Sequence, residues 1–300
     1  MIRFVHGIWV IGLALLLTGC TEGLLEVRKD EGHIIVSPDW QVYSLPSLAA
    51  CHFYTESGTA TPHVYKEVAA DTFSCSLPLG IYRLLAYNTD VEGVEFVSQE
   101  NIDCIAASLT SDVQPGELFV WEVAQMKVLL RDTLHFAPAP RALVKTLRLN
   151  FRLTGIENIS NIAGTLYGVY PSVCLLTGQP SVESVTAAPT TSVSFVAKVR
   201  QKARTADCEG VSSVRLFGLL DPQEGEQYDN RLQLNLHLTD GEVRPAEVDM
   251  NKAFSDILAQ NGGEIPPEVP VDIEIEIRWI GSSLAATVKQ WSIGKGEGGV

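Results

Sequence analysis

Basic side chains are scarce in this chain of 300 residues, which has 22 lysines and arginines against 36 aspartates and glutamates. The resulting net charge of −14 repels phosphate backbones, so nucleic acid is not an expected partner. No basic cluster follows the apolar N-terminal segment, which argues against electrostatic docking to anionic lipid. Hydrophobic residues make up 46% of the chain, enough apolar surface for a packed core rather than disorder.

The sequence also lacks the common catalytic and metal-binding motifs. It contains no H-E-x-x-H, no G-x-S-x-G, no Walker sequence and no C-x-x-C. The histidines are scattered, and none pairs with another at metal-ligand spacing. The glycines at 294–299 have no helix after them whose dipole could hold a phosphate. We therefore expect no enzyme activity, no cofactor and no metal site.

Cysteines are few and irregularly spaced. Beyond Cys20, the chain has Cys51, Cys75, Cys104, Cys174 and Cys208, an odd number. The first three of these could supply one disulfide in an oxidising envelope. The alternative, which we favour, is that they are small buried hydrophobic residues.

The N-terminus carries an apolar run of ten residues, Ile8 to Leu17. A stable membrane anchor needs about 20 such residues, so the run fits the core of a secretory signal peptide. It ends in Leu17-Thr18-Gly19-Cys20, which resembles the lipobox of bacterial lipoproteins. The resemblance implies cleavage before Cys20, with residues 1–19 as signal peptide, and acylation of Cys20. An ordinary signal peptide with a chance cysteine and a buried N-terminal helix are the alternatives.

Acyl chains on Cys20 would hold the protein on a membrane, since each buried methylene contributes about 0.8 kcal/mol. Thr21 is not the aspartate that often retains lipoproteins in an inner membrane. We therefore expect a lipid-anchored protein of the outer membrane, facing the cell surface. Residues 20–32 are rich in charge and leave little to bury, so they are predicted to form a tether.

Strand signals dominate from residue 33 to residue 138. The segments at 33–37, 48–54 and 117–130 are rich in β-branched and aromatic residues. Residues 71–90 indicate a strand, a turn with Pro78 and Gly80, and a second strand. The prolines of HFAPAPRA (135–142) cannot continue a central strand. They predict a boundary between one domain at 33–138 and another at 139–300.

The second half contains stretches of strict alternation. They are TLRLNFRL (146–153), RLQLNLHL (231–238) and VDIEIEIRW (271–279). Each presents one apolar and one polar face, which is typical of half-buried strands in antiparallel sheets. Asp240-Gly241 is a hairpin signal.

One helix is predicted at 247–263, with Asp249 as N-cap and Gly262 as C-cap. Phe254, Ile257 and Leu258 would share its apolar face.

The acidic row Asp272, Glu274 and Glu276 points one way from a predicted strand. It suggests either a calcium or acid/base site or, as we favour, a solvent face that discourages aggregation. Arg148 and Arg152, on the polar face of another strand, are expected to lie across from these acids.

Four stretches carry a family resemblance. They are the lipobox, LPLGIYRLLAYNTD (77–90), the long segment at 144–178 and VKQWSIGKGEGGV (288–300). Together they resemble the fimbrillin-like lipoproteins of Bacteroidetes, a group that includes major and minor fimbrial subunits. The resemblance implies an all-β fold with one short helix, built as two tandem transthyretin-like antiparallel β-sandwiches. It also implies a structural or adhesive role, as a pilus component, accessory subunit or adhesin-type binding module.

In polymerising members of that group, an Arg-directed protease removes an N-terminal strand, and a neighbouring subunit fills the groove by β-strand addition. Arg28 and Lys29 lie where such a cut would fall. An uncut anchor, tip or accessory subunit is the alternative, with these residues as ordinary linker charges. Other fimbrial subunits are the partners that the resemblance implies.

Two further expectations concern the surface. Asp132-Thr133-Leu134 resembles the short sites that some envelope bacteria O-glycosylate, which makes Thr133 a candidate. The competing function is an outer-membrane lipoprotein that captures carbohydrate or another nutrient. It would require Trp40, Trp121, Trp279 and Trp291 to form an exposed platform.

Overall fold

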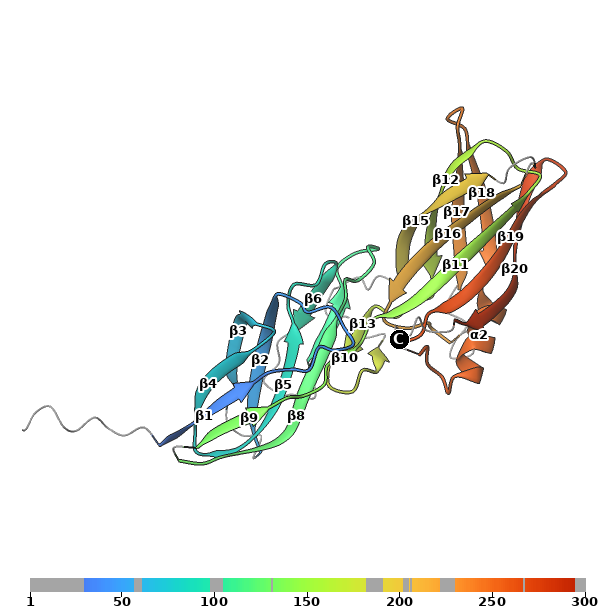
Figure 1. Ribbon diagram of the computed structural model, residues 1–300. Coiled ribbons are helices and arrows are strands. Elements are labelled where there is room, and N and C mark those ends of the chain that lie inside the picture. The colour runs from blue at the N-terminus through green and yellow to red at the C-terminus, as the bar shows by residue number, and fades with distance from the viewer. Residues whose placement is uncertain are drawn as a thin grey trace, which may run out of the picture.

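The computed structural model describes residues 30–56, 61–97, 105–130, 132–181, 191–201, 205, 207–221, 230–266 and 268–294. Cys20, Arg28, Lys29 and Cys104 therefore lie outside the described residues. The described chain forms four β-sheets and one helix, α2 (Asn251–Gln260). Figure 1 shows two halves end to end, with the start of β1 (Glu31–Val36) at one end of the molecule. Among the described residues, no helix has the length and hydrophobicity to cross a bilayer.

Two sheets pack face to face in the first half. One has the order β4-β1-β9 and the other the order β10-β8-β5-β2-β3. Buried side chains from both, such as Ile34, Phe53 and Trp121, form a core between them. The remaining strands are β2 (Leu48–Thr55), β3 (His63–Ala69), β4 (Phe73–Pro78), β5 (Gly80–Asn88), β8 (Phe119–Val128), β9 (Thr133–Phe136) and β10 (Arg141–Ala142).

A third sheet covers the outer face of the five-stranded sheet. Its order is β14-β13-β7-β6, from β6 (Val94–Val97), β7 (Ala106–Leu109), β13 (Ser172–Cys174) and β14 (Pro180–Ser181). The rings of Tyr87 on β5 and Phe96 on β6 lie 4.7 Å apart. Strands β2 and β5 are therefore buried on both faces, which explains why they are apolar without alternation.

The third sheet also joins the two halves of the chain. Strands β6 and β7 precede the predicted boundary at 138/139, whereas β13 and β14 follow it. The antiparallel β7–β13 ladder pairs Ser108 with Ser172 and Ala106 with Cys174. The boundary itself stays a prediction, but the halves on either side of it share a sheet.

The second half is one eight-stranded sheet, ordered β18-β17-β12-β15-β16-β11-β19-β20. Strands β15 and β16 pair through only four residue pairs, near one end, so the sheet folds there into two layers. The alternating residues face the core as predicted, with Leu147, Leu149 and Leu153 fully buried. Trp279, the last residue of the predicted apolar face of 271–279, is instead exposed at the end of β19. The strands are β11 (Lys145–Thr154), β12 (Ile159–Tyr167), β15 (Ser192–Gln201), β16 (Cys208–Leu216), β17 (Arg231–Leu238), β18 (Val243–Asp249), β19 (Val271–Ile280) and β20 (Ser283–Ile293).

The expectation of purely antiparallel sheets is wrong at two pairings. Strand β1 pairs in parallel with β9, and β11 pairs in parallel with β19. Alternation reports which faces of a strand are wet, not the direction of its neighbour. Parallel neighbours need a long connection, and the long stretch of chain between β11 and β19 provides one.

Helix α2 is shorter than predicted at both ends. Residues 247–249 finish strand β18, and Met250 is the N-cap, without a side-chain capping bond. The carboxylate of Asp249 instead accepts a hydrogen bond from the backbone N–H of Asn251 at 2.8 Å. At the other end the C-cap is Asn261, not Gly262. The apolar face is as predicted, because Phe254, Ile257 and Leu258 are buried.

The described cysteines are free thiols. Cys51 and Cys75 lie in the core of the first half, Cys208 is buried in the second half and Cys174 is partly exposed. Burial raises the pKa of the Cys51 thiol to about 12. Cys51, Cys75 and Cys208 thus behave as the small buried hydrophobic residues that we favoured.

Candidate functional site

Among the described residues, no group of three or more His, Cys, Asp or Glu side chains is arranged to hold a metal ion. His33 and His135 are exposed on the outer sheet of the first half, and His237 is half-buried on β17. These histidines come from separate elements, which matches their scatter in the sequence.

His52 is the buried histidine that sequence reasoning missed. Its ring is fully buried between the sheets and lies between Tyr54 and Tyr87. The Tyr87 hydroxyl is 3.3 Å from Nε2, and the Tyr54 hydroxyl is 3.5 Å from Nδ1. Loss of water, together with the charge of Lys66, lowers the pKa of His52 to about 4. A neutral ring beside two hydroxyls has a packing role. The sequence indicated this histidine only as a polar residue inside the apolar run 48–54.

The acidic row on β19 is neutralised by its neighbours. Arg148 lies 3.6 Å from Asp272, Arg152 lies 3.7 Å from Glu274, and Lys289 lies 2.8 Å from Glu276. The predicted placement of Arg148 and Arg152 across from the acids is confirmed. Such partly exposed pairs contribute about 0–1 kcal/mol each, so the row is a solvated face that also fixes strand register.

The four described tryptophans do not form a platform. Trp121 is buried, and Trp40 covers it at 5.3 Å while donating to the Ala70 carbonyl oxygen. In the second half, Trp291 packs against the core, and Trp279 is 39% exposed with Arg244 over its ring. In the β19–β20 ladder, Trp279 pairs with Leu284 near one end and Trp291 pairs with Ile273 near the other. The arrangement that the nutrient-capture function requires is thus absent from the described tryptophans.

A surface groove of about 280 Å³ lies between α2 and β20. Ala253, Val288 and Trp291 line it, and at its rim Lys252 contacts Asp256 at 2.6 Å. Because the carboxylate of Asp256 is already paired, it does not present a free acid to a ligand.

Strand β1 is held on both sides. It pairs antiparallel with β4 and parallel with β9, and Ile34 and Val36 point into the core. The strand begins at Glu31, after the predicted cleavage residues Arg28 and Lys29. The sequence from 30 to 65 contains no lysine or arginine. A cut at either predicted residue would therefore leave β1 in its sheet, and the next basic residue, Lys66, lies inside β3.

Thr133, the candidate for O-glycosylation, is exposed at the start of β9. It lies beside His33 of β1 in the register of the parallel pair. Its hydroxyl is thus accessible from solvent at the same end of the molecule as the start of β1, and its glycosylation stays a prediction.

The loop between β7 and β8 bonds to both β15 and β16 where these two strands are not paired with each other. Where β15 and β16 part, Gln114 donates through Nε2 to the Ser194 carbonyl oxygen at 3.0 Å. Its Oε1 accepts from the backbone N–H of Arg215 at 2.9 Å. Ser194 also donates to the carboxylate of Asp112 at 2.6 Å. This loop therefore supplies hydrogen bonds that two separated strands cannot give each other.

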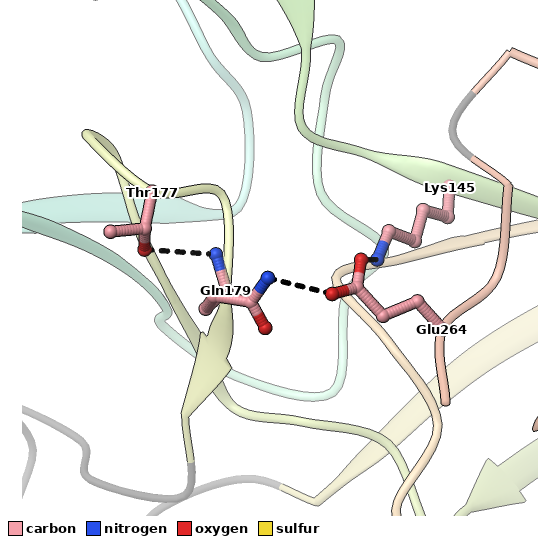
Figure 2. Close-up of polar contacts among 4 residues, drawn as sticks. All are labelled: Lys145, Thr177, Gln179 and Glu264. Atoms are coloured by element: carbon pink, nitrogen blue, oxygen red, sulfur yellow. Dashed lines mark hydrogen bonds and ion pairs between the residues drawn. The ribbon is translucent and has the colours of Figure 1, made fainter. Parts of the chain in front are cut away.

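A buried lysine, Lys145, lies at the start of β11, where the β13–β14 turn meets the second half. Lys145, 3% exposed, places Nζ 3.4 Å from Glu264 Oε2, and Gln179 Nε2 donates to Oε1 of the same carboxylate at 2.7 Å (Figure 2). The backbone N–H of Gln179 donates to Thr177 Oγ1 at 3.2 Å. Burial lowers the pKa of Lys145, although Glu264 acts in the opposite direction. The group ties β11, the β13–β14 turn and the segment after α2 together.

Comparison with known proteins gives a consistent structural picture. No protein-family model matches the chain, and no curated protein matches it. A candidate adhesin from Bacteroides ovatus superposes with a TM-score of 0.56 at 16% identity, covering 91% of this chain and 97% of that one. The fimbrial anchor protein Mfa2 of Porphyromonas gingivalis gives a TM-score of 0.48 at 14% identity, over 87% of this chain and 96% of that one.

The tip fimbrial protein Mfa3 of the same organism gives a TM-score of 0.42 at 11% identity, over 88% of this chain and 99% of that one. The Bacteroides ovatus candidate adhesin shows that the fold extends over nearly the whole chain. The resemblance to the fimbrillin-like proteins of Bacteroidetes, found in four stretches of sequence, is thus confirmed at the level of the fold.

Proposed function

We propose that this chain is a lipid-anchored, surface-facing fimbrillin-like protein, which acts as a pilus accessory subunit or an adhesin-type binding module. The observation that carries the proposal is the fold shared with a candidate adhesin over 91% of this chain. A chain of two β-rich halves offers surfaces and strand edges to a partner.

Acylated Cys20 is the anchor in this proposal, and the outer membrane is the site of attachment. Residues 20–32 are the proposed tether, and strand β1 begins within that range, at Glu31. In this proposal the chain forms two transthyretin-like domains, at 33–138 and at 139–300. Thr133 is the proposed glycosylated residue, and other fimbrial subunits are the proposed partners by β-strand addition.

The position of β1 favours the uncut version of the subunit. A cut after Arg28 or Lys29 separates Cys20 from the fold but leaves β1 between β4 and β9. Such a cut opens no groove, so its product is a released monomer rather than a polymerising subunit. Strand addition to this chain then uses an existing sheet edge, not a vacated strand position.

The test follows the anchor and the cut in one preparation. The full chain is produced in a bacterial host with labelled palmitate, beside Cys20→Ala and a double Arg28→Gln, Lys29→Gln variant. We expect the palmitate label on the wild-type chain and none on the Cys20→Ala variant. Brief trypsin treatment of whole cells should release a soluble monomer from wild type and none from the double variant. An unlabelled wild-type chain, or SDS-resistant ladders after nicking, would contradict the proposal.

A further inference from the structure

Three exposed leucines gather where the chain enters the fold. Leu79, Leu129 and Leu130 are 43%, 44% and 48% exposed. Leu79 lies in the turn between β4 and β5, and the other two follow β8. We call these three residues the leucine base.

The strand register brings them together. Gly80 pairs with Val128 and Ile81 with Lys127 in the antiparallel β5–β8 ladder. Leu79 directly precedes Gly80, and Leu129 directly follows Val128, so both leucines adjoin this last pair of the ladder. Leu130 follows in the turn that ends at Asp132. The three exposed leucines thus lie at the same end of two neighbouring strands.

The same tip is the attachment point of the tether. The backbone N–H of Leu79 donates to the carbonyl oxygen of Asp30 at 3.1 Å. A Cβ on Gly32 would lie 2.5 Å from the carbonyl oxygen of Leu129, so the first residues of β1 run directly past the base. Figure 1 shows this end of the first half far from the turn between β19 and β20.

We propose that the leucine base is a membrane-contacting surface, inserted into the interface of the bilayer that holds the Cys20 lipid. The proposal rests on the proposed lipid anchor. Ten residues from Cys20 to Asp30 span at most about 35 Å, so the base cannot leave the neighbourhood of the lipid surface. Weak apolar insertion is sufficient there, because the tether converts it into an intramolecular event with a high effective concentration.

The proposed contact is with hydrocarbon rather than with anionic headgroups. In the sequence beside the leucines, Asp30, Glu31 and Asp132 outnumber Lys127 and Arg131, so there is no basic excess. Three leucines that are each a little under half exposed should strengthen surface binding roughly 10- to 100-fold. The consequence is a defined orientation, with the opposite end of the molecule pointing away from the membrane.

The test holds the chain on a membrane without using its own lipid. Residues 21–300, with a polyhistidine tag in place of Cys20, are bound to phosphatidylcholine vesicles that contain nickel-chelating lipid. A Leu130→Trp variant is compared with Ile280→Trp, whose site is 56% exposed at the far end. With brominated phosphatidylcholine, the emission added by Leu130→Trp should fall by about half, since interfacial groups insert about 5–10 Å. The emission added by Ile280→Trp should not change.

A second measurement uses binding strength. Serine at all three base positions should weaken vesicle binding of the tagged chain roughly 10- to 100-fold, whereas Ile280→Ser should leave it unchanged. Matching denaturation curves establish that the variants fold. Unquenched Leu130→Trp, or a solution dimer that the serine variant abolishes, would overturn the membrane assignment. Missing palmitate on Cys20 counts against the proposed anchor instead, and the tagged chain still tests the base.

Discussion

Acid should destabilise the first half through His52. The unfolded ring binds a proton with a pKa near 6.5, whereas the folded ring does so with a pKa of about 4. Between these values the unfolded state binds more protons, so the free energy of unfolding falls as the pH falls. The expected loss from this residue is about 2 kcal/mol at pH 5 and about 3 kcal/mol below pH 4.

The assay is urea denaturation at pH 7 and pH 5, followed by tryptophan fluorescence, which includes Trp40 and Trp121 in the first half. His52→Gln removes the titrating group and keeps a polar side chain near the two tyrosine hydroxyls. The variant should be less stable at pH 7 but should lose about 2 kcal/mol less than wild type on acidification. His135→Gln, on an exposed site, is the matched control and should behave as wild type. Equal acid losses in wild type and His52→Gln would refute this reasoning.

Three further substitutions probe the junction and the second half. Gly168→Ala should cost about 2–4 kcal/mol, because φ is +84° and the new Cβ would lie 1.8 Å from Asn230 Oδ1; thermal denaturation measures it. Gln114→Ala should cost about 1–3 kcal/mol by leaving two backbone groups unpaired, whereas exposed Gln125→Ala should cost almost nothing in the same denaturation. Lys145→Met should be neutral or stabilising in the same denaturation, since an apolar side chain replaces a buried charge. Glu264→Ala should be destabilising, because it leaves the buried charge of Lys145 without its partner. Destabilisation by both variants would contradict this account.

The second half was largely predictable because its strands have one wet face. In β11, β17 and β19, alternation identifies the core residues directly, and the arginines opposite the acidic row follow from the same pattern. The first half gave a weaker signal. Strand β2 is buried on both faces, so it has no period of two, and the ring of His52 is hidden in an apolar run.

Sheet connections over long sequence distances could not be predicted. The ladder between β7 and β13 consists of three residue pairs and has no local signature in either strand. The same holds for Gln114, whose two partners are 80 and 101 residues away along the chain. Both contacts depend on where the two halves meet. The proline-rich segment 135–142 reads as a linker in the sequence, so it gives no sign that the halves are in contact. The prolines themselves mark only an interruption of strands.

Neighbouring domains of one chain move freely unless their interface is large and apolar, and here a single cluster of buried side chains crosses the junction. One continuous cluster of buried side chains runs from Tyr87 and Leu109 in the first half to Leu147 and Ile277 in the second. A hinge at the junction would have to expose part of this cluster and break the β7–β13 ladder and the Gln114 bonds together. Stiffness therefore comes from the junction, and orientation would come from the leucine base. In the proposed function, a chain with both properties would hold its far end at a fixed distance from the membrane.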